Sequence, residues 1–397
     1  MTYPDAVVIG AGHNGLVAAN VLADAGWSVV VREAEPEPGG AVASGELVEA
    51  GFVNDRFSAF FPLGAASPVF RTLGLQIPWR HGPLVLAHPA EDRSCAVLER
   101  GPAGELWDRI EPALLQAMTT PFPQVRAGLQ LALEPAALGL LRLPADALER
   151  RIVIGNALHT DAPPLSLIGR MFGMLLTKFG RRYGYPCVEG GAGAITRQLA
   201  ERAERRGVEI HYGERVERIP HARRGVIAAI DGWQLARLLG RESELRPDPA
   251  TLKVDWTLDG PIPWSAEPAR RSPVVHIGGP GAFAILGQYS MADPTRAPDG
   301  KEVAWSYTHD LSSPDAIEAT VERLAPGFRS LIRGRHIAQL PPGRLNGGTA
   351  RRLRLHRPEV AHGIFLGSMS AHPGGGVHGA PGWIAAQAAL QAANRGV

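Results

Sequence analysis

The N-terminal stretch Ala6-Val-Val-Ile-Gly10-Ala-Gly12-His-Asn-Gly15 decides the fold of this chain. Its apolar, β-branched start predicts a buried parallel strand, and residues 16–25 are good helix formers. Gly10 permits a tight turn, Gly12 lets the backbone approach a pyrophosphate, and Gly15 allows close packing of helix on strand. The N–H groups and the dipole at the helix start favour phosphate binding. The stretch therefore predicts an α/β fold that binds a nucleotide.

The residues around this loop extend the pattern. Residues 28–32 predict a second strand, and Glu33 follows it about 20 residues after the glycine loop. A carboxylate at that place can accept hydrogen bonds from ribose hydroxyls, which disfavours a ligand with a 2′-phosphate. His13 and Asn14 occupy the variable loop positions, where His13 either lies near the phosphates or has no role in binding. Strand, glycines, helix, strand and acid in this order indicate an adenine nucleotide site.

Composition narrows the class of protein. A chain of 397 residues with 45% hydrophobic content can bury a large core and predicts two domains. The 41 basic and 39 acidic residues nearly balance, and no basic run alternates with aromatic residues, so we expect no nucleic-acid partner. Cys95 and Cys187 form no C-x-x-C pair, which argues against a disulfide framework and a redox dithiol.

The hydropathy pattern predicts a cytoplasmic protein. No run of 18 apolar residues occurs, because charged residues interrupt residues 127–143 and 165–179. The first strand is expected near Asp5, which leaves no room for a signal peptide. Residues 165–179 predict an apolar helix that packs in the core, lines a tunnel or contacts a membrane surface. Peripheral membrane contact therefore stays open.

A second glycine-rich segment, residues 364–379, lies near the other end of the chain. Its three consecutive glycines would let the backbone reach a flat ring. A helix starting at Gly379 would present N–H groups that stabilise negative charge on a reduced flavin. His372 and His378 invite a metal interpretation, but no third acidic or cysteine ligand stands nearby, so we expect no metal.

Glu33-Ala-Glu-Pro-Glu-Pro-Gly39-Gly40 resembles the E-A-x-x-x-x-G-G segment of flavin amine oxidases and phytoene desaturases. In those proteins the glycine pair passes beside the flavin diphosphate, and an arginine often follows where this chain has Ala41. With the other motifs in order, the chain resembles the phytoene-desaturase-like FAD oxidoreductases. Within that group it resembles the branch of pyridine nucleotide-disulfide oxidoreductase domain-containing protein 2. The resemblance implies that FAD is the cofactor.

The resemblance also implies the domain organisation. The expected fold is a Rossmann-like FAD-binding domain of the glutathione-reductase/amine-oxidase type, with an interleaved α+β substrate domain. Residues 1–75, 186–240 and 345–397 would form the FAD-binding domain, and residues 76–185 and 241–344 the substrate domain. The chain is shorter than such relatives, and the strand–turn–strand expected after Ile219 is missing or severely shortened.

Site residues follow from the motifs and the resemblance together. Residues 208–219 predict a strand or bent strand pair, in which the family places a backbone contact to adenine near Val216. His372 is a catalytic candidate beside the flavin. The expected cofactor-binding residues are Gly10, Gly12, His13, Asn14, Gly15, Glu33, Gly39, Gly40, Val216, Gly374, Gly375, Gly376 and Gly379.

Lys253 is the second catalytic candidate. In flavin amine oxidases a strand lysine, followed by a turn with tryptophan, holds a water at flavin N5, and Lys253-Val-Asp-Trp…Pro-Trp264 resembles that arrangement. Such a lysine would assist reoxidation by O₂, because it stabilises superoxide-like charge. The alternative is a solvent-facing strand lysine. Residues 250–264 predict a strand followed by a turn, and together with residues 284–291 and 302–309 they predict three strands of a sheet that faces the flavin.

The expected reaction is a two-electron dehydrogenation, or desaturation, of a small apolar or amphipathic substrate by hydride transfer to flavin N5. The sequence shows no second nucleotide-binding domain for a nicotinamide cofactor, so O₂ or a quinone is the expected electron acceptor. A flavin amine oxidase stays open, with an aromatic cage from Trp256, Trp305 or Tyr307. So do a carotenoid-type isomerase and an FAD-binding scaffold that has lost catalysis. The sequence assigns no oligomeric state.

Overall fold

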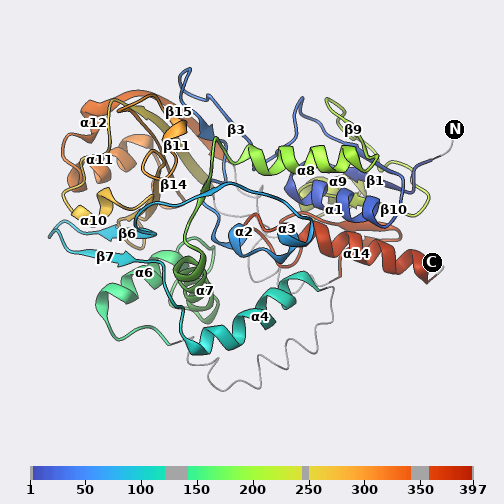
Figure 1. The fold of residues 1–397 in the computed structure, drawn as a ribbon, viewed down its shortest axis with the longest axis horizontal. Coiled ribbons are helices and arrows are strands. Elements are labelled where there is room, and N and C mark those ends of the chain that lie inside the picture. The colour runs from blue at the N-terminus through green and yellow to red at the C-terminus, as the bar shows by residue number, and fades with distance from the viewer. Residues whose placement is uncertain (1–2, 121–141, 244–249, 341–356, 396–397) are drawn as a thin grey trace.

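The computed structural model describes residues 3–120, 142–243, 250–340 and 357–395, which form two lobes built on separate sheets (Figure 1). The first sheet is mainly parallel and has the strand order β16-β17-β10-β1-β2-β9. Its strands are β1 (Ala6–Ile9), β2 (Val29–Arg32), β9 (Glu209–His211), β10 (Gly225–Ala228), β16 (Glu359–Ala361) and β17 (Ile364–Leu366). Helices α1 (His13–Asp24), α8 (Gly193–Arg205) and α14 (Ala380–Asn394) pack on it, and α9 (Gly232–Leu238) follows β10.

The glycines of the β1–α1 loop have the geometry that the sequence predicts for the turn and the packing. Gly10 has a φ of 98°, a left-handed conformation that glycine adopts without steric cost. A Cβ on Gly15 would lie 2.0 Å from the Gly10 carbonyl oxygen, so only glycine lets α1 approach β1 this closely. At the other end of the chain, a Cβ on Gly382 would lie 1.9 Å from the Asn14 oxygen. Helix α14 therefore packs directly against α1.

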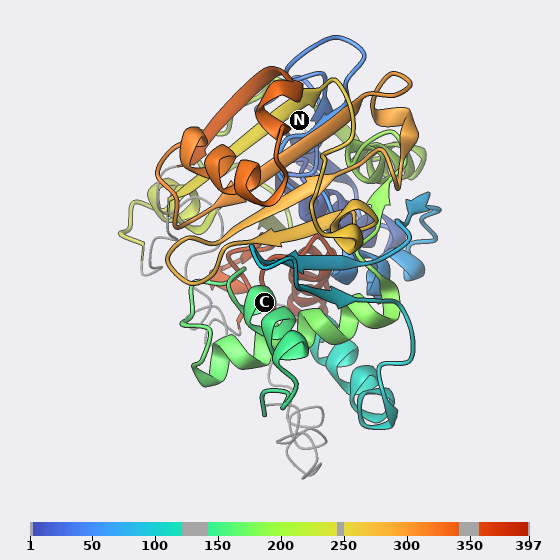
Figure 2. The same cartoon turned by 90° about the vertical axis from the view of Figure 1, so that its left-hand side faces the viewer.

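The second sheet has the order β15-β11-β14-β13-β12-β6-β7. Its strands are β6 (Leu86–Pro89), β7 (Cys95–Leu98), β11 (Thr251–Leu258), β12 (Val274–Ile277), β13 (Ala284–Gln288), β14 (Glu302–Thr308) and β15 (Ile332–Leu340). Helices α11 (Pro314–Leu324) and α12 (Phe328–Leu331) cover its outer face (Figure 2). Side chains alternate between the two faces of a strand. Val254 and Trp256 accordingly join the core beneath these helices, and Lys253 and Asp255 lie on the other face of the strand, where Lys253 contacts Asp55.

A helical layer closes the molecule below both sheets (Figure 1). It contains α4 (Glu105–Thr119), α6 (Ala147–Ala157) and α7 (Leu167–Tyr183). The shorter elements are β3 (Ser44–Gly45), β4 (Asn54–Asp55), α2 (Pro62–Ala66), α3 (Pro68–Thr72), β5 (Trp79–Arg80), β8 (Cys187–Val188), α10 (Glu267–Arg270) and a 3₁₀ turn, η2 (Pro294–Arg296).

Two expectations about the elements are corrected. Residues 208–219 form a strand only at β9, and residues 214–219 are irregular, because β9 is an edge strand that pairs with β2 alone. Residues 76–185 are helix-rich as expected, but they also supply β6 and β7, which pair into the second sheet beside β12. The three predicted strands of that sheet are present as β11, β13 and β14.

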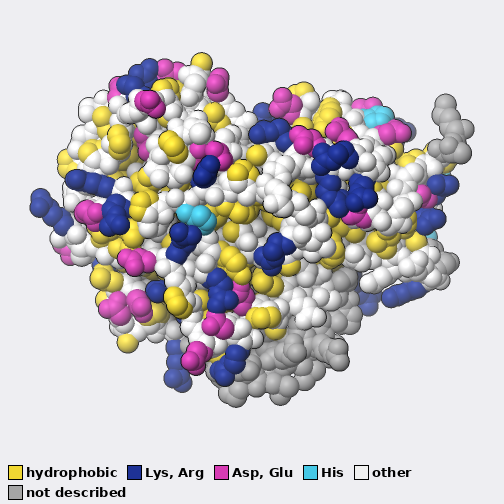
Figure 3. Space-filling model, in the orientation of Figure 1, with side chains coloured by type: hydrophobic (Ala, Val, Ile, Leu, Met, Phe, Trp, Pro, Cys, Tyr) yellow, Lys and Arg dark blue, Asp and Glu magenta, His cyan; other side chains and the backbone are white. Residues whose placement is uncertain are grey.

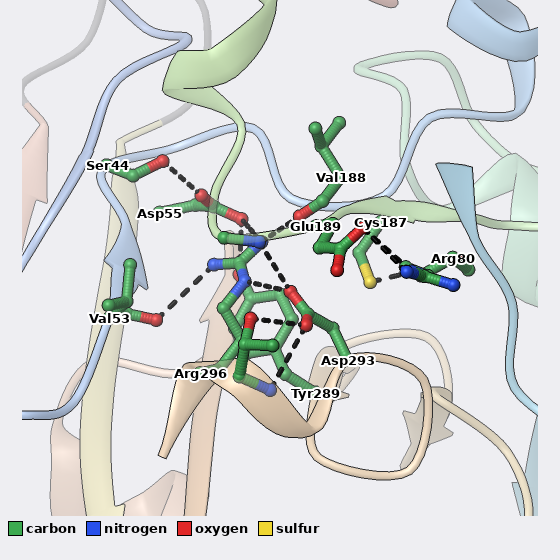
Figure 4. A network of polar contacts seen from close by, with 12 residues as sticks. Ser44, Val53, Asp55, Arg80, Cys187, Val188, Glu189, Tyr289, Asp293 and Arg296 are labelled. Atoms are coloured by element: carbon green, nitrogen blue, oxygen red, sulfur yellow. Dashed lines mark hydrogen bonds and ion pairs between the residues drawn. The ribbon is translucent and has the colours of Figure 1, made fainter. Parts of the chain in front are cut away.

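A buried ion network joins the two lobes (Figure 4). Arg296, fully buried, contacts the carboxylates of Asp55 at 3.2 Å and Asp293 at 2.8 Å. Asp55 accepts further hydrogen bonds from the Tyr289 hydroxyl at 2.9 Å and from the backbone N–H of Ala192 at 2.8 Å. Every charge in the network thus has an opposite partner, as burial requires.

The surface combines both signs of charge. On the face seen in Figure 3, basic and acidic side chains are interspersed. None of the helices within the described ranges is long and apolar enough to cross a membrane. Leu165 and Leu167, near the start of α7, are 63% and 59% exposed, and peripheral membrane contact stays a prediction. Most of the apolar stretch 127–143 lies outside the described residues.

Replacing Arg296 with methionine should destabilise the protein by about 3–5 kcal/mol, because the change leaves two buried carboxylates without their cation. Urea unfolding of the two proteins measures the difference. Arg323→Met is the matched control, since Arg323 pairs with Glu91 in solvent, and it should change stability much less. Equal effects of the two substitutions would contradict the structural role of the network.

Candidate flavin site and active site

A cavity of about 640 Å³ follows the carboxyl ends of β1 and β2. It begins at the β1–α1 loop, passes the end of β2, and reaches residues 214–217 and 229–231. In open α/β sheets, ligands bind outside the carboxyl ends of the parallel strands. This is therefore the place where the sequence predicts a nucleotide.

Glu33 closes one side of the cavity. Its two carboxylate oxygens accept hydrogen bonds from the backbone N–H of Ala11 at 2.5 Å and of Glu35 at 2.9 Å. The side chain is only 8% exposed, yet it borders the cavity. Glu33 thus fixes the glycine loop and the β2 end relative to each other, and contact with a ribose stays a prediction.

The cavity has the features that a diphosphate needs. A Cβ on Gly12 would meet only the Gly39 oxygen, at 3.9 Å, so the missing side chain leaves open space. Gly39 and Gly12 form an isolated parallel bridge, which places the second glycine loop beside the first. Helix α1 starts at Gly12 without a side-chain cap, and Asn14 Oδ1 is buried with no hydrogen-bond partner among the described residues. Uncapped N–H groups, a helix dipole and glycine clearance together fit a phosphate-bearing cofactor.

The predicted cofactor-binding residues divide into three groups. Gly10, Gly12, His13, Asn14, Glu33, Gly40 and Val216 border the nucleotide cavity, and Gly375 and Gly376 border a second cavity. The remaining ones, Gly15, Gly39, Gly374 and Gly379, line neither cavity. Gly379 begins α14, and a Cβ there would lie 3.0 Å from a methyl of Val17. These last glycines permit backbone turns or close packing, and their contact with a ligand stays a prediction.

Two buried histidines support the glycine loops as neutral groups. His378 donates from Nε2 to the Gly375 oxygen at 3.1 Å, and its Nδ1 accepts from the N–H of Ala380 at 3.2 Å. Burial lowers the pKa of His378 to about 4 and that of His13 to about 3, and the second histidine of the pair adds to the effect on His13. His13 is therefore uncharged at neutral pH and offers a ligand hydrogen bonding rather than charge.

The second cavity, of about 350 Å³, adjoins the first and shares Ala41, Phe57 and Met369 with it. Much of its wall is apolar. Among its apolar lining residues are Phe57, Phe60, Leu63, Phe172, Leu176, Val274, Ile285 and Met369. Phe172 and Leu176 come from α7, so the helix predicted at 165–179 lines a cavity. A small, mostly apolar cavity that opens beside the nucleotide end is the candidate substrate pocket.

Lys253 lies in the wall of this cavity and is only 2% exposed, so the alternative of a solvent-facing lysine is wrong. Its ammonium forms a short ion pair with Asp255 and donates to the Asp55 backbone oxygen at 3.1 Å. Burial lowers the pKa of Lys253 although Asp255 favours its charged form. The lysine is buried because β11 is a central strand between β14 and β15.

Only two of the three residues proposed for an aromatic cage lie at the cavity. Trp305 and Tyr307 line the cavity, with nearly parallel rings whose centroids are 5.9 Å apart. Trp256 does not: it is buried on the opposite face of β11, where its indole N–H donates to Glu318. Successive side chains of a strand point to opposite faces, so Trp256 faces away from the cavity that Lys253 lines. The suggestion that Trp256 contributes to an aromatic cage is therefore wrong.

His372 lies beside the cavity without lining it. Its Nε2 is 3.4 Å from the oxygen of Ala117 in α4, and the following Pro373 borders the cavity. Its catalytic role stays a prediction. Sequence reasoning assigned no role to His159, His276 or Asp55. Asp55 and His159 nevertheless stand in segments, residues 54–68 and 155–159, that resemble the family. Their positions depend on long-range packing.

The chain belongs to the flavin containing amine oxidoreductase family, whose sequence profile matches residues 15–241. A limonene dehydrogenase component from Castellaniella defragrans is 40% identical over 72 residues, which is 18% of this chain and 13% of that protein. The chain thus matches only a small part of that curated relative.

Solved structures share the fold over nearly the whole chain. An oxidoreductase from Methanosarcina mazei has a TM-score of 0.64 at 16% identity and covers 97% of this chain and 99% of its own. Wild-type putrescine oxidase bound to putrescine has a TM-score of 0.61 at 16% identity, and the match covers 99% of this chain and 98% of that one. Cyclohexylamine oxidase from Brevibacterium oxydans has a TM-score of 0.59 at 16% identity, and the match covers 99% of each chain. At these identities the likeness shows the fold alone.

Family and cavity together identify an FAD-dependent oxidoreductase fold with FAD as its cofactor. Among the described residues, no group of three or more histidine, cysteine or acidic side chains could hold a metal ion.

Replacing Gly12 with valine should weaken FAD binding about 100-fold, because the side chain fills the space between the two glycine loops. This corresponds to about 2.7 kcal/mol. Fluorescence titration of the apoprotein with FAD measures the change. Gly101→Val is the matched control, since a Cβ there meets no atom within 4 Å and Gly101 lines neither cavity. Unchanged affinity in Gly12→Val would show that the cofactor does not pass this loop.

Proposed function

We propose that this protein is an FAD-dependent dehydrogenase that removes a hydride and a proton from a small apolar or amphipathic substrate. The observation that carries the proposal is the mostly apolar cavity that adjoins the nucleotide cavity at Ala41, Phe57 and Met369. When bound, the flavin supplies a hydride acceptor at N5. The phytoene-desaturase-like branch is the corresponding family assignment.

The cavity wall favours a substrate that binds mainly by burial of apolar surface. Aromatic and aliphatic side chains from α7, β12 and β13 line it. The local similarity to the limonene dehydrogenase component points the same way, since that protein's name specifies a hydrocarbon substrate. A cyclic hydrocarbon of the size of limonene is therefore the first substrate to test.

An amine oxidase is the second candidate. Putrescine oxidase and cyclohexylamine oxidase share the fold, and Asp161 gives the cavity wall a carboxylate that an ammonium group can approach. Trp305 and Tyr307 add two aromatic rings to the same wall. A cyclic amine therefore tests this candidate in the same cavity.

Lys253 is proposed to assist reoxidation by O₂, which we take as the electron acceptor in preference to a quinone. Its ammonium donates to the Asp255 carboxylate and to the Asp55 backbone oxygen, and its third N–H is left for a water in the cavity. A cation held in a water-poor cavity stabilises the negative charge that develops on reduced oxygen.

Limonene should bleach the flavin absorbance of the FAD-loaded protein under anaerobic conditions and yield a product with two fewer hydrogen atoms. Stopped-flow absorbance and mass spectrometry of the product measure this. Cyclohexylamine is the comparison, and bleaching by the amine alone would establish the amine oxidase instead. Rearranged limonene without bleaching would indicate an isomerase. No reaction with either compound would contradict the proposal and favour a scaffold.

Replacing Lys253 with methionine should slow reoxidation of the reduced flavin by O₂ about 10-fold or more, because the stabilising charge is lost. The substitution also leaves Asp255 buried without its cation, so Lys253→Met should be compared with Lys253→Met/Asp255→Asn, which removes both charges. Stopped-flow reoxidation of the photoreduced proteins measures the rates. Reoxidation at the wild-type rate in the double variant would exclude this role.

A further inference from the structure

A buried cluster of the histidines His88, His159 and His276 reaches the cavity wall at His159, and the reaction described so far does not use it. His159 lines the cavity, and its Nε2 is 3.1 Å from Nε2 of His276, while its Nδ1 is 3.3 Å from the hydroxyl of Tyr307. His276 is fully buried, and its Nδ1 has no hydrogen-bond partner among the described residues. Three titratable groups thus form one continuous hydrogen-bonded chain that starts at the cavity.

The sheet register builds this chain. Tyr307 on β14 pairs with Ile285 on β13, and Ile285 pairs with His276 on β12, so the three side chains point to the same face. His159 follows the end of α6 and bridges Tyr307 and His276 across Ile285. A Cβ on Gly155 would lie 2.4 Å from Nδ1 of His276, so this glycine lets α6 lie directly on the strand.

One of the two tautomeric arrangements of these hydrogen bonds leads a proton from Tyr307 to His276. An N···N hydrogen bond between two neutral imidazoles needs one donor and one acceptor. If the Tyr307 hydroxyl donates to Nδ1 of His159, then Nε2–H of His159 donates to Nε2 of His276, which carries its own proton on Nδ1. The phenol oxygen still has lone pairs that a proton from the cavity can reach.

We propose that Tyr307, His159 and His276 form a proton relay that accepts the proton released by the substrate, with His276 at its end. The inference rests on the proposed dehydrogenation, in which the hydride goes to the flavin. The phenol oxygen of Tyr307 takes the substrate proton, and the hydroxyl proton passes to Nδ1 of His159. The Nε2 proton of His159 then passes to Nε2 of His276, which becomes an imidazolium, so every bond broken is matched by one formed.

The surroundings keep the relay neutral before the reaction. Burial lowers the pKa of His159 to about 3 and that of His276 well below its ordinary value. The groups that face the relay from neighbouring elements are His88 on β6, Lys253 on β11, His309 after β14, Tyr185 after α7 and Asp161 after α6. Burial disfavours a cation on His276, so the proton is held only transiently. A neutral base is thus available throughout the neutral pH range.

The first test is direct and needs no substrate. In protein labelled with ¹⁵N-histidine, the N–H···N bond should give a resolved two-bond coupling between Nε2 of His159 and Nε2 of His276. His159→Gln and His276→Gln should abolish it. His88→Gln is the matched control, since His88 is a buried histidine of the same cluster that bonds instead to the Gly278 oxygen. Absence of the coupling in the wild-type protein would overturn the relay.

The second test measures the role in the reaction. Anaerobic flavin reduction by limonene should slow about 100-fold or more in His159→Gln and His276→Gln and stay within about threefold in His88→Gln. The bound flavin spectrum reports that each variant is folded. In mixed H₂O and D₂O the wild-type rate should follow a curved dependence on deuterium content, because several protons move, and His276→Gln should give a straight line.

The two tests separate this inference from the proposed function. Failure of limonene to reduce the wild-type flavin would contradict the proposed substrate, while the coupling would still support or exclude the hydrogen-bonded relay. Flavin reduction at the wild-type rate in His159→Gln would overturn the relay and leave the dehydrogenase assignment intact. An unchanged curved deuterium dependence in His276→Gln would exclude His276 as the end of the relay.

Discussion

The contact between Asp55 and Arg296 is the interaction on which the arrangement of the two lobes depends. Asp55 lies on β4, whereas Arg296 and Tyr289 belong to the segment between β13 and β14. The same carboxylate accepts the N–H of Ala192, immediately before α8 of the nucleotide lobe. Such a network costs desolvation energy that a well-packed apolar core would not, so its contribution is specificity: one relative position satisfies all its partners.

This fixed position matters because the substrate cavity lies between elements from both lobes. The backbone oxygen of Asp55 accepts a hydrogen bond from Lys253, so the ion network and the cavity wall share a residue. On the other side, Gly375 and Gly376 bring the loop before α14 to the same cavity. A shift of one lobe against the other would move the cofactor relative to the substrate, and hydride transfer is sensitive to displacements of about 1 Å.

The nucleotide lobe could be predicted from the sequence because its signals are local. Gly10, Gly15 and Glu33 stand within one strand–helix–strand unit, where turn geometry and helix packing leave few alternatives. The burial of Lys253 could not be predicted, since it depends on β14 and β15, which pair with β11 from about 50 or more residues away in the chain. The prediction of a strand at residues 214–219 is wrong because the β-branched residues there have no partner strand, and local sequence does not reveal that absence.

The candidate active site was the least predictable part, because its members meet only through register. His159 and His276 are 117 residues apart in the chain. Neither stands in a motif whose spacing indicates catalysis, and a lone histidine on an apolar face is usually a core residue. Lys253, whose charge Asp255 favours, and His159, which burial keeps neutral, both line the cavity. The proposed dehydrogenation would use both groups, because a fixed cation stabilises charge on the electron acceptor and a neutral base takes the proton.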